Sequence, residues 1–143
     1  ETQRIRVLVV DDSTVVRRIV AKVLGDDPRI EVVGTAVNGR IALEKVTTLR
    51  PDVITLDLEM PVLSGMDVLR QLPPDGPGAI VVSAYTEQGS KLAVEALAIG
   101  AAEVIRKPQI GASASAFAAS SLETALPFCS SSSAFMLADR SIR

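Results

Sequence analysis

The chain has 143 residues, 48% of them hydrophobic, which is enough for one α/β domain and too few for two domains of ordinary size. Its 15 basic and 17 acidic side chains give a net charge of −2, so no general attraction to nucleic acid or to an anionic membrane is expected. Histidine is absent, which excludes Ser/His/Asp and Cys/His nucleophilic systems and every metal site built on imidazole.

Several further classes of protein are disfavoured by what the sequence lacks. A single cysteine, Cys129, cannot form an internal disulfide, which predicts a reducing compartment and hence the cytoplasm. No apolar stretch reaches the roughly 18 residues of a membrane span, and no signal peptide opens the chain. The start at Glu1 without a methionine suggests a truncated chain. Neither a P-loop nor the glycine fingerprint of dinucleotide-binding domains occurs.

The first half of the chain alternates between strand and helix patterns. Residues 5–10 form an apolar run that predicts a strand, and the acids Asp11 and Asp12 follow it directly. Ser13 or Thr14 can cap a helix whose apolar residues recur at helical spacing up to residue 24. Residues 30–36 predict a second strand, and Asn38 opens a helix that must stop before residue 51, a proline.

The second half continues the alternation through three more strands. Residues 51–57 form a buried apolar run that ends in Asp57. Ser64, with Asp67 three residues later, resembles a capping box for a short helix that residues 73–77 end. Residues 79–83 predict a fourth strand, which ends in Ser83, and a helix from about residue 90 to 99 follows. Residues 102–106 predict a fifth strand, which leads into Lys107.

Five strands alternating with four helices predict an α/β fold: a doubly wound, five-stranded parallel sheet with helices on both faces. The strand order 2-1-3-4-5 would bring the ends of the first and third strands together. We expect one domain over residues 3–126, with its core at 4–110. A last, poorly amphipathic helix is expected at about residues 112–126, and residues 127–143, rich in serine, are expected to be a linker or a disordered tail.

Three carboxylates are therefore predicted at one edge of the sheet, those of Asp11, Asp12 and Asp57. Two like charges about 4 Å apart repel by about 4 kcal/mol at an effective dielectric near 20, so a divalent cation or raised pKa values must relieve the site. An oxygen-seeking ion such as Mg²⁺ fits best. We expect Asp12 to bind Mg²⁺ directly, Asp11 through water, and the backbone carbonyl of Glu59 to add a further ligand.

The same edge carries the groups that phosphoryl transfer requires. Asp57 is interpreted as a phosphate-accepting nucleophile, with a carboxylate that only caps the next turn as the alternative. Lys107 is expected to bind the phosphoryl group, although surface lysines are common. Ser83, unremarkable alone, becomes a hydrogen-bond donor to a phosphoryl oxygen in this setting. The metal ion and the lysine would position the phosphoryl donor and stabilise its charge. In-line phosphoryl transfer depends mainly on these two effects.

The type and spacing of these residues resemble the response-regulator receiver family. The resemblance implies a CheY-like fold and phosphotransfer to Asp57 from the phosphohistidine of a sensor kinase, after which the phosphorylated state regulates an output. Residues 56–61, 83–90 and 107–109 further resemble the N-terminal regulatory domain of chemotaxis protein-glutamate methylesterases (CheB). That likeness implies a CheA-like kinase partner and a methylesterase output domain, with no direct contact to nucleic acid or membrane.

Two departures from the family pattern qualify the resemblance. Val104 stands where the family often has an aromatic residue that swings inward on phosphorylation. A methylesterase domain would need a catalytic histidine, so this chain is expected to be no enzyme beyond its own phosphotransfer and dephosphorylation. The alternatives are a receiver of a DNA-binding or stand-alone regulator and, in a different class, a small Mg²⁺-dependent phosphatase with an aspartyl nucleophile. The haloacid-dehalogenase form of such a phosphatase would have D-x-D after the first strand, where this chain has Asp11-Asp12-Ser13.

Overall fold

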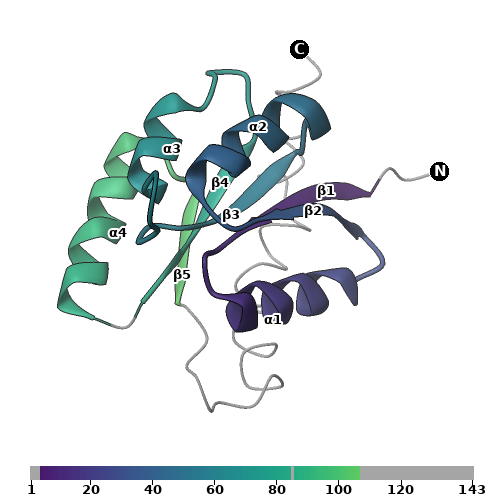
Figure 1. The fold of residues 1–143 in the computed structure, drawn as a ribbon, viewed down its shortest axis with the longest axis horizontal. Helices are drawn as coiled ribbons and strands as arrows, with labels where there is room; N and C mark the ends of the chain where they lie inside the picture. The colour runs from purple at the N-terminus through teal and green to yellow at the C-terminus, as the bar shows by residue number, and fades with distance from the viewer. Residues whose placement is uncertain (1–3, 85, 107–143) are drawn as a thin grey trace.

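The computed structural model describes residues 4–84 and 86–106, which form a single sheet flanked by helices (Figure 1). The strands are β1 (Ile5–Val10), β2 (Ile30–Ala36), β3 (Val53–Asp57), β4 (Gly78–Ser83) and β5 (Glu103–Arg106). The helices are α1 (Thr14–Gly25), α2 (Gly39–Leu49), α3 (Gly65–Gln71) and α4 (Glu87–Ile99). None of the helices in these two ranges is long and apolar enough to cross a membrane.

The strand order is β2-β1-β3-β4-β5 with every neighbouring pair parallel, which confirms the order expected from the sequence. In register, Val10 of β1 lies beside Leu56 of β3, and Asp57 lies beside Val82 of β4. The carboxyl ends of β1, β3 and β4 are therefore level at one edge. This is the edge where open parallel sheets bind ligands.

The helices lie on both faces because successive strands are added first on one side of β1 and then on the other. After β1 the chain moves outward to β2, and from β2 it crosses back over β1 to β3 and then continues to β5. Since each crossover is right-handed, the first connection and the later ones fall on opposite faces. Figure 1 shows α1 on one side of the sheet and α2, α3 and α4 on the other. Two apolar clusters fill the two interfaces, one with α1 and one with the other three helices.

Each of the four helices α1 to α4 begins at a side-chain cap that satisfies an otherwise unpaired backbone amide. The caps are Ser13, Asn38, Ser64 and Thr86, and each accepts a hydrogen bond from the third residue after it. The predicted start of the last of these helices near residue 90 is wrong, because Thr86 caps it and α4 begins at Glu87. The expected helix at 112–126, the tail at 127–143 and Lys107 lie outside the described residues.

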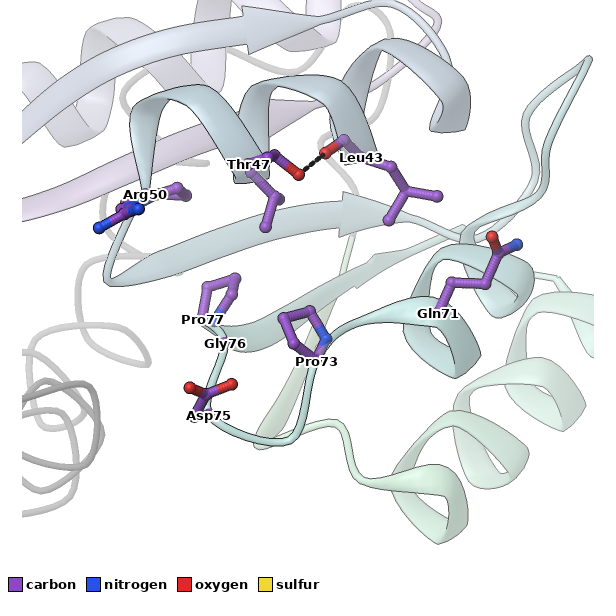
Figure 2. A pocket seen from close by; sticks show the side chains of 10 residues that line it. Leu43, Thr47, Arg50, Gln71, Pro73, Asp75, Gly76 and Pro77 are labelled. Carbon is purple, nitrogen blue, oxygen red and sulfur yellow. Dashed lines mark hydrogen bonds between the residues drawn. The ribbon is translucent and has the colours of Figure 1, made fainter. Parts of the chain in front are cut away.

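A groove of about 720 Å³ lies at the edge of the sheet opposite the predicted carboxylates. Figure 2 shows Leu43, Thr47 and Arg50 of the α2 region on one side of it and the α3–β4 loop, with Pro73 and Pro77, on the other. Of its lining residues, Pro77 directly precedes β4 and Pro51 lies two residues before β3, so the groove borders the amino ends of these strands. The groove is therefore separate from the candidate site.

Candidate functional site

Three carboxylates meet at the carboxyl edge of the sheet, as the sequence predicts. Asp11 and Asp12 directly follow β1, Asp57 ends β3, and one carboxylate oxygen from each lies within 4.8 Å of the others. Asp11 and Asp57 are buried, at 2% and 3% exposure, whereas Asp12 is exposed. The cluster therefore combines two buried acids with one acid that is open to solvent.

Backbone amides hold the two buried carboxylates in place. The Ser13 amide donates to Asp11 Oδ1 at 2.8 Å, and the Glu59 amide donates to Asp57 Oδ1 at 3.2 Å. The amide of Asp11 itself donates to the carbonyl of Ala36 at 3.1 Å. Each acid is thus fixed by the turn after its own strand, a local geometry that aspartate adopts readily.

The N-terminus of α3 packs directly against the end of β3, and this contact requires a glycine. A Cβ atom on Gly65 would lie 2.1 Å from the carbonyl oxygen of Asp57. The Gly65 amide also donates to the carbonyl of Leu58 at 3.0 Å. In the same loop Val62 has φ of 73°, a left-handed conformation that is costly for a β-branched residue. Sequence reasoning missed both residues; the glycine directly after the Ser64 cap was the available signal.

Ser83 ends β4 with its hydroxyl held by the first turn of α4. The residue is 3% exposed, and Oγ donates to the carbonyl of Gly89 at 3.0 Å. Gly89 in turn donates its amide to Thr86 Oγ1 at 2.8 Å, the cap of the same helix. Val104 on β5 is half-buried and packs against the cluster beneath α2, α3 and α4. The Ser83 hydroxyl is therefore linked to the helix whose start it adjoins.

The charge and chemistry of the cluster suit a small, hard cation. Unit charges 4.8 Å apart repel by about 3–4 kcal/mol at an effective dielectric near 20. The clustered groups offer oxygen atoms only, which Mg²⁺ and Ca²⁺ prefer and which softer transition metals do not require. An exposed acid beside two buried ones also leaves a path for a hydrated ion to enter. The donor set thus fits the ion expected from the sequence.

Comparison with known proteins identifies the family. The model of the response regulator receiver domain matches residues 7–114, most of the chain. The chain belongs to the response regulator receiver family. This receiver domain is similar to the structure of the response regulator domain of Thermotoga maritima CheB, with 38% identity and a TM-score of 0.76 over 90% of this chain and 98% of that one. The family and the CheY-like fold expected from the sequence are confirmed.

Curated relatives of this receiver domain carry a more specific name. It is 50% identical over 113 residues to protein-glutamate methylesterase/protein-glutamine glutaminase 2 of Koribacter versatilis, and 49% identical over 109 residues to the corresponding protein of Desulfotalea psychrophila. These matches cover 78% and 75% of this chain but 31% and 30% of the relatives. The chain therefore spans about a third of the length of these relatives and resembles their receiver part.

A further structural relative was solved with a partner. One chain of the crystal structure of the P1 domain of CheA3 in complex with CheY6 from R. sphaeroides matches this chain at 31% identity and a TM-score of 0.69, over 87% of this chain and 98% of that one. Together with the family match, these relatives show a receiver domain of a two-component system that is similar to CheB and CheY receiver domains.

Proposed function

We propose that Asp57 accepts a phosphoryl group from the phosphohistidine of a CheA-like sensor kinase and that phosphorylation controls an output. The observation that carries the proposal is the position of Asp57: its buried carboxylate lies within 4.8 Å of Asp11 and Asp12 at the carboxyl edge of the sheet. A lone capping aspartate needs no such neighbours. Clustered acids are tolerable where a cation and a phosphoryl group share the site.

The residues would divide the reaction between them. A carboxylate oxygen of Asp57 forms the new P–O bond while the P–N bond to the kinase histidine breaks and the imidazole leaves. Asp12, Asp57 and the backbone carbonyl of Glu59 would hold Mg²⁺ directly, and Asp11 through water. When bound, this ion neutralises charge on the transferred phosphoryl oxygens. Lys107 is proposed to bind the phosphoryl group from the end of β5.

Phosphorylation would be read out through Ser83 and α4. The modification adds about −1.5 to −2 charges, which favours a hydroxyl that turns from the Gly89 carbonyl toward a phosphoryl oxygen. Among its thirteen residues α4 buries only Gly89 and Ala96, so few contacts oppose its movement. It also exposes Val94 and Leu97, at 68% and 48% exposure, as an apolar surface for an output partner. The aromatic swing common in the family would be absent, because Val104 is small.

The parent protein is proposed to be a chemotaxis-type methylesterase that acts in the cytoplasm. The names of the curated relatives support this output, and the CheA3–CheY6 complex supports the kinase. The single cysteine supports a reducing compartment. A DNA-binding or stand-alone regulator would share the same site but would carry a different output domain, or none. A sub-stoichiometric amount of this chain that turned over a small phosphoester would instead favour the phosphatase alternative.

Asp57 should be the residue that a small phosphoryl donor modifies. Acetyl phosphate with Mg²⁺ should add one phosphoryl group, labile to hydroxylamine, because an acyl phosphate is a mixed anhydride. Intact-protein mass spectrometry should show the added mass in the parent chain and not in Asp57→Asn. Asp75→Asn is the matched control, since Asp75 is exposed at the opposite edge of the sheet and its loss should change nothing. Label that persists in Asp57→Asn would place the phosphoacceptor elsewhere.

A further inference from the structure

Arg17, on the first turns of α1, reaches back to the loop that carries two of the three acids. Its Nη1 donates to the backbone carbonyl of Asp11 at 2.8 Å, and its Nη2 donates to Thr14 Oγ1 at 3.4 Å. The side chain is half-buried, whereas its neighbour Arg18 is exposed. Two adjacent arginines on one helix therefore differ in environment, and one of them is attached to the acidic loop.

The carbonyl that Arg17 binds belongs to the peptide bond between Asp11 and Asp12. The Asp11 carbonyl and the Asp12 amide belong to one planar peptide unit, so fixing the carbonyl fixes the plane from which Asp12 projects. Asp11 is already held at its amide by Ala36 and at its carboxylate by Ser13. The guanidinium adds a third restraint, at the carbonyl that leads to Asp12.

Asp12 depends on this restraint more than the other two acids do. Asp11 and Asp57 are buried and fixed by surrounding atoms, but Asp12 is exposed and has less packing to hold it. The position of its carboxylate therefore depends mainly on its backbone. From this geometry we infer that Arg17 is a positioning residue for the metal site: it fixes the peptide unit between Asp11 and Asp12 so that the Asp12 carboxylate faces Asp57.

The inference rests on the metal site proposed above. It can be tested by whether removing Arg17 raises or lowers the affinity for Mg²⁺. A guanidinium that acted only through its charge would repel a cation, so its removal would strengthen Mg²⁺ binding. A positioning residue has the opposite effect, since removing a group that orients a metal ligand weakens binding. Charge effects also fade at high ionic strength, where the Debye length falls to about 3 Å at 1 M salt, whereas a hydrogen-bonded restraint persists.

The test compares Arg17→Ala with Arg18→Ala. The second variant removes the same charge from the next residue, which is exposed. Mg²⁺ affinity should be measured by calorimetry on the full chain at about 0.15 M and about 1 M salt. We expect Arg17→Ala to weaken Mg²⁺ binding by about tenfold at both salt concentrations, the low end for losing a partner of a metal ligand. Arg18→Ala should leave the affinity unchanged or slightly higher. Arg17→Lys, which keeps one donor group, should recover part of the loss.

A second measurement separates this inference from the proposed function. In the metal-free chain, the ¹⁵N–¹H nuclear Overhauser effect of the Asp12 amide should fall in Arg17→Ala and not in Arg18→Ala, because only the first loses the restraint. An unchanged Asp12 amide in Arg17→Ala, or Mg²⁺ affinity equal to or above that of the parent, would overturn the role of Arg17. Absence of Mg²⁺ binding in the parent would instead reject the metal site, and the amide measurement would still decide whether Arg17 orders Asp12.

Discussion

The ion pair between Asp27 and Arg29 should contribute to the pH dependence of stability. They lie in the turn between α1 and β2, where Arg29 Nη2 meets Asp27 Oδ2 at 2.7 Å and Arg29 Nε donates to Asp27 Oδ1 at 3.0 Å. The Arg29 amide donates to the same oxygen at 2.9 Å. The side-chain hydrogen bonds from Arg29 lower the pKa of Asp27, and they outweigh burial, which alone would raise it.

Replacing Asp27 with Asn should therefore destabilise the fold in a pH-dependent way. Because the folded pKa lies below the unfolded value, Asp27 contributes stability above about pH 3.9 that is lost as the pH falls through the folded pKa. We expect Asp27→Asn to lower the free energy of unfolding by about 1–2 kcal/mol at pH 7. The difference should shrink as the pH falls below about 4. Urea unfolding at pH 7 and at successively lower pH values measures both effects.

Asp26 provides the matched control. Its contact with Lys22 spans 3.6 Å, and the side chains are 70% and 73% exposed, so solvent screens the pair. Asp26→Asn should change the free energy of unfolding by less than about 0.5 kcal/mol at either pH. Equal losses in the two variants would mean that the bidentate geometry of the Asp27–Arg29 pair has no special effect.

Among the helices, α4 begins earlier than the sequence predicts. Ser90 is a good capping residue and Gly89 is a poor helix former, so local preference favours a later start. The structure instead uses Thr86 as the cap and places Gly89 in the first turn. The reason is tertiary: the helix backbone passes so close to the end of β4 that only a glycine fits at position 89.

Gly89→Ala should accordingly destabilise the start of α4. An added Cβ would lie 2.5 Å from the Ala84 carbonyl oxygen and 3.2 Å from Ser83 Oγ, so the backbone must shift. We expect the free energy of unfolding to fall by about 1–3 kcal/mol, the usual cost of overpacking. Gly25→Ala is the control, because nothing lies within 4 Å of its added Cβ and alanine favours a helix by about 1 kcal/mol. A neutral Gly89→Ala would show that the helix can move away from β4 at no cost.

The sheet and the acidic cluster could both be predicted from the sequence because both arise from short-range patterns. Apolar runs of strand length fix the strands, and acids placed directly after β1 and β3 meet wherever those strands are neighbours. The features that the sequence did not predict depend on how distant parts of the chain meet, either through close backbone contacts, as at Gly65 and Gly89, or through the direction of a side chain. Arg17 and Arg18 look alike in the sequence, yet only the structure shows which one turns toward Asp11.

The acidic cluster also links metal binding to the stability of the whole fold, because an ion that binds only the folded state stabilises it. At ten times its dissociation constant, Mg²⁺ should add about 1.4 kcal/mol and raise Tm by about 5 °C. At the same Mg²⁺ concentration Asp12→Asn should lose most of this rise, since it replaces a charged carboxylate ligand with a neutral amide oxygen that binds Mg²⁺ more weakly. It should also raise Tm in EDTA, because one of three carboxylates within 4.8 Å loses its charge. Asp75→Asn, at the opposite edge, should keep the full Mg²⁺ response; the same full response in Asp12→Asn would place the ion away from this cluster.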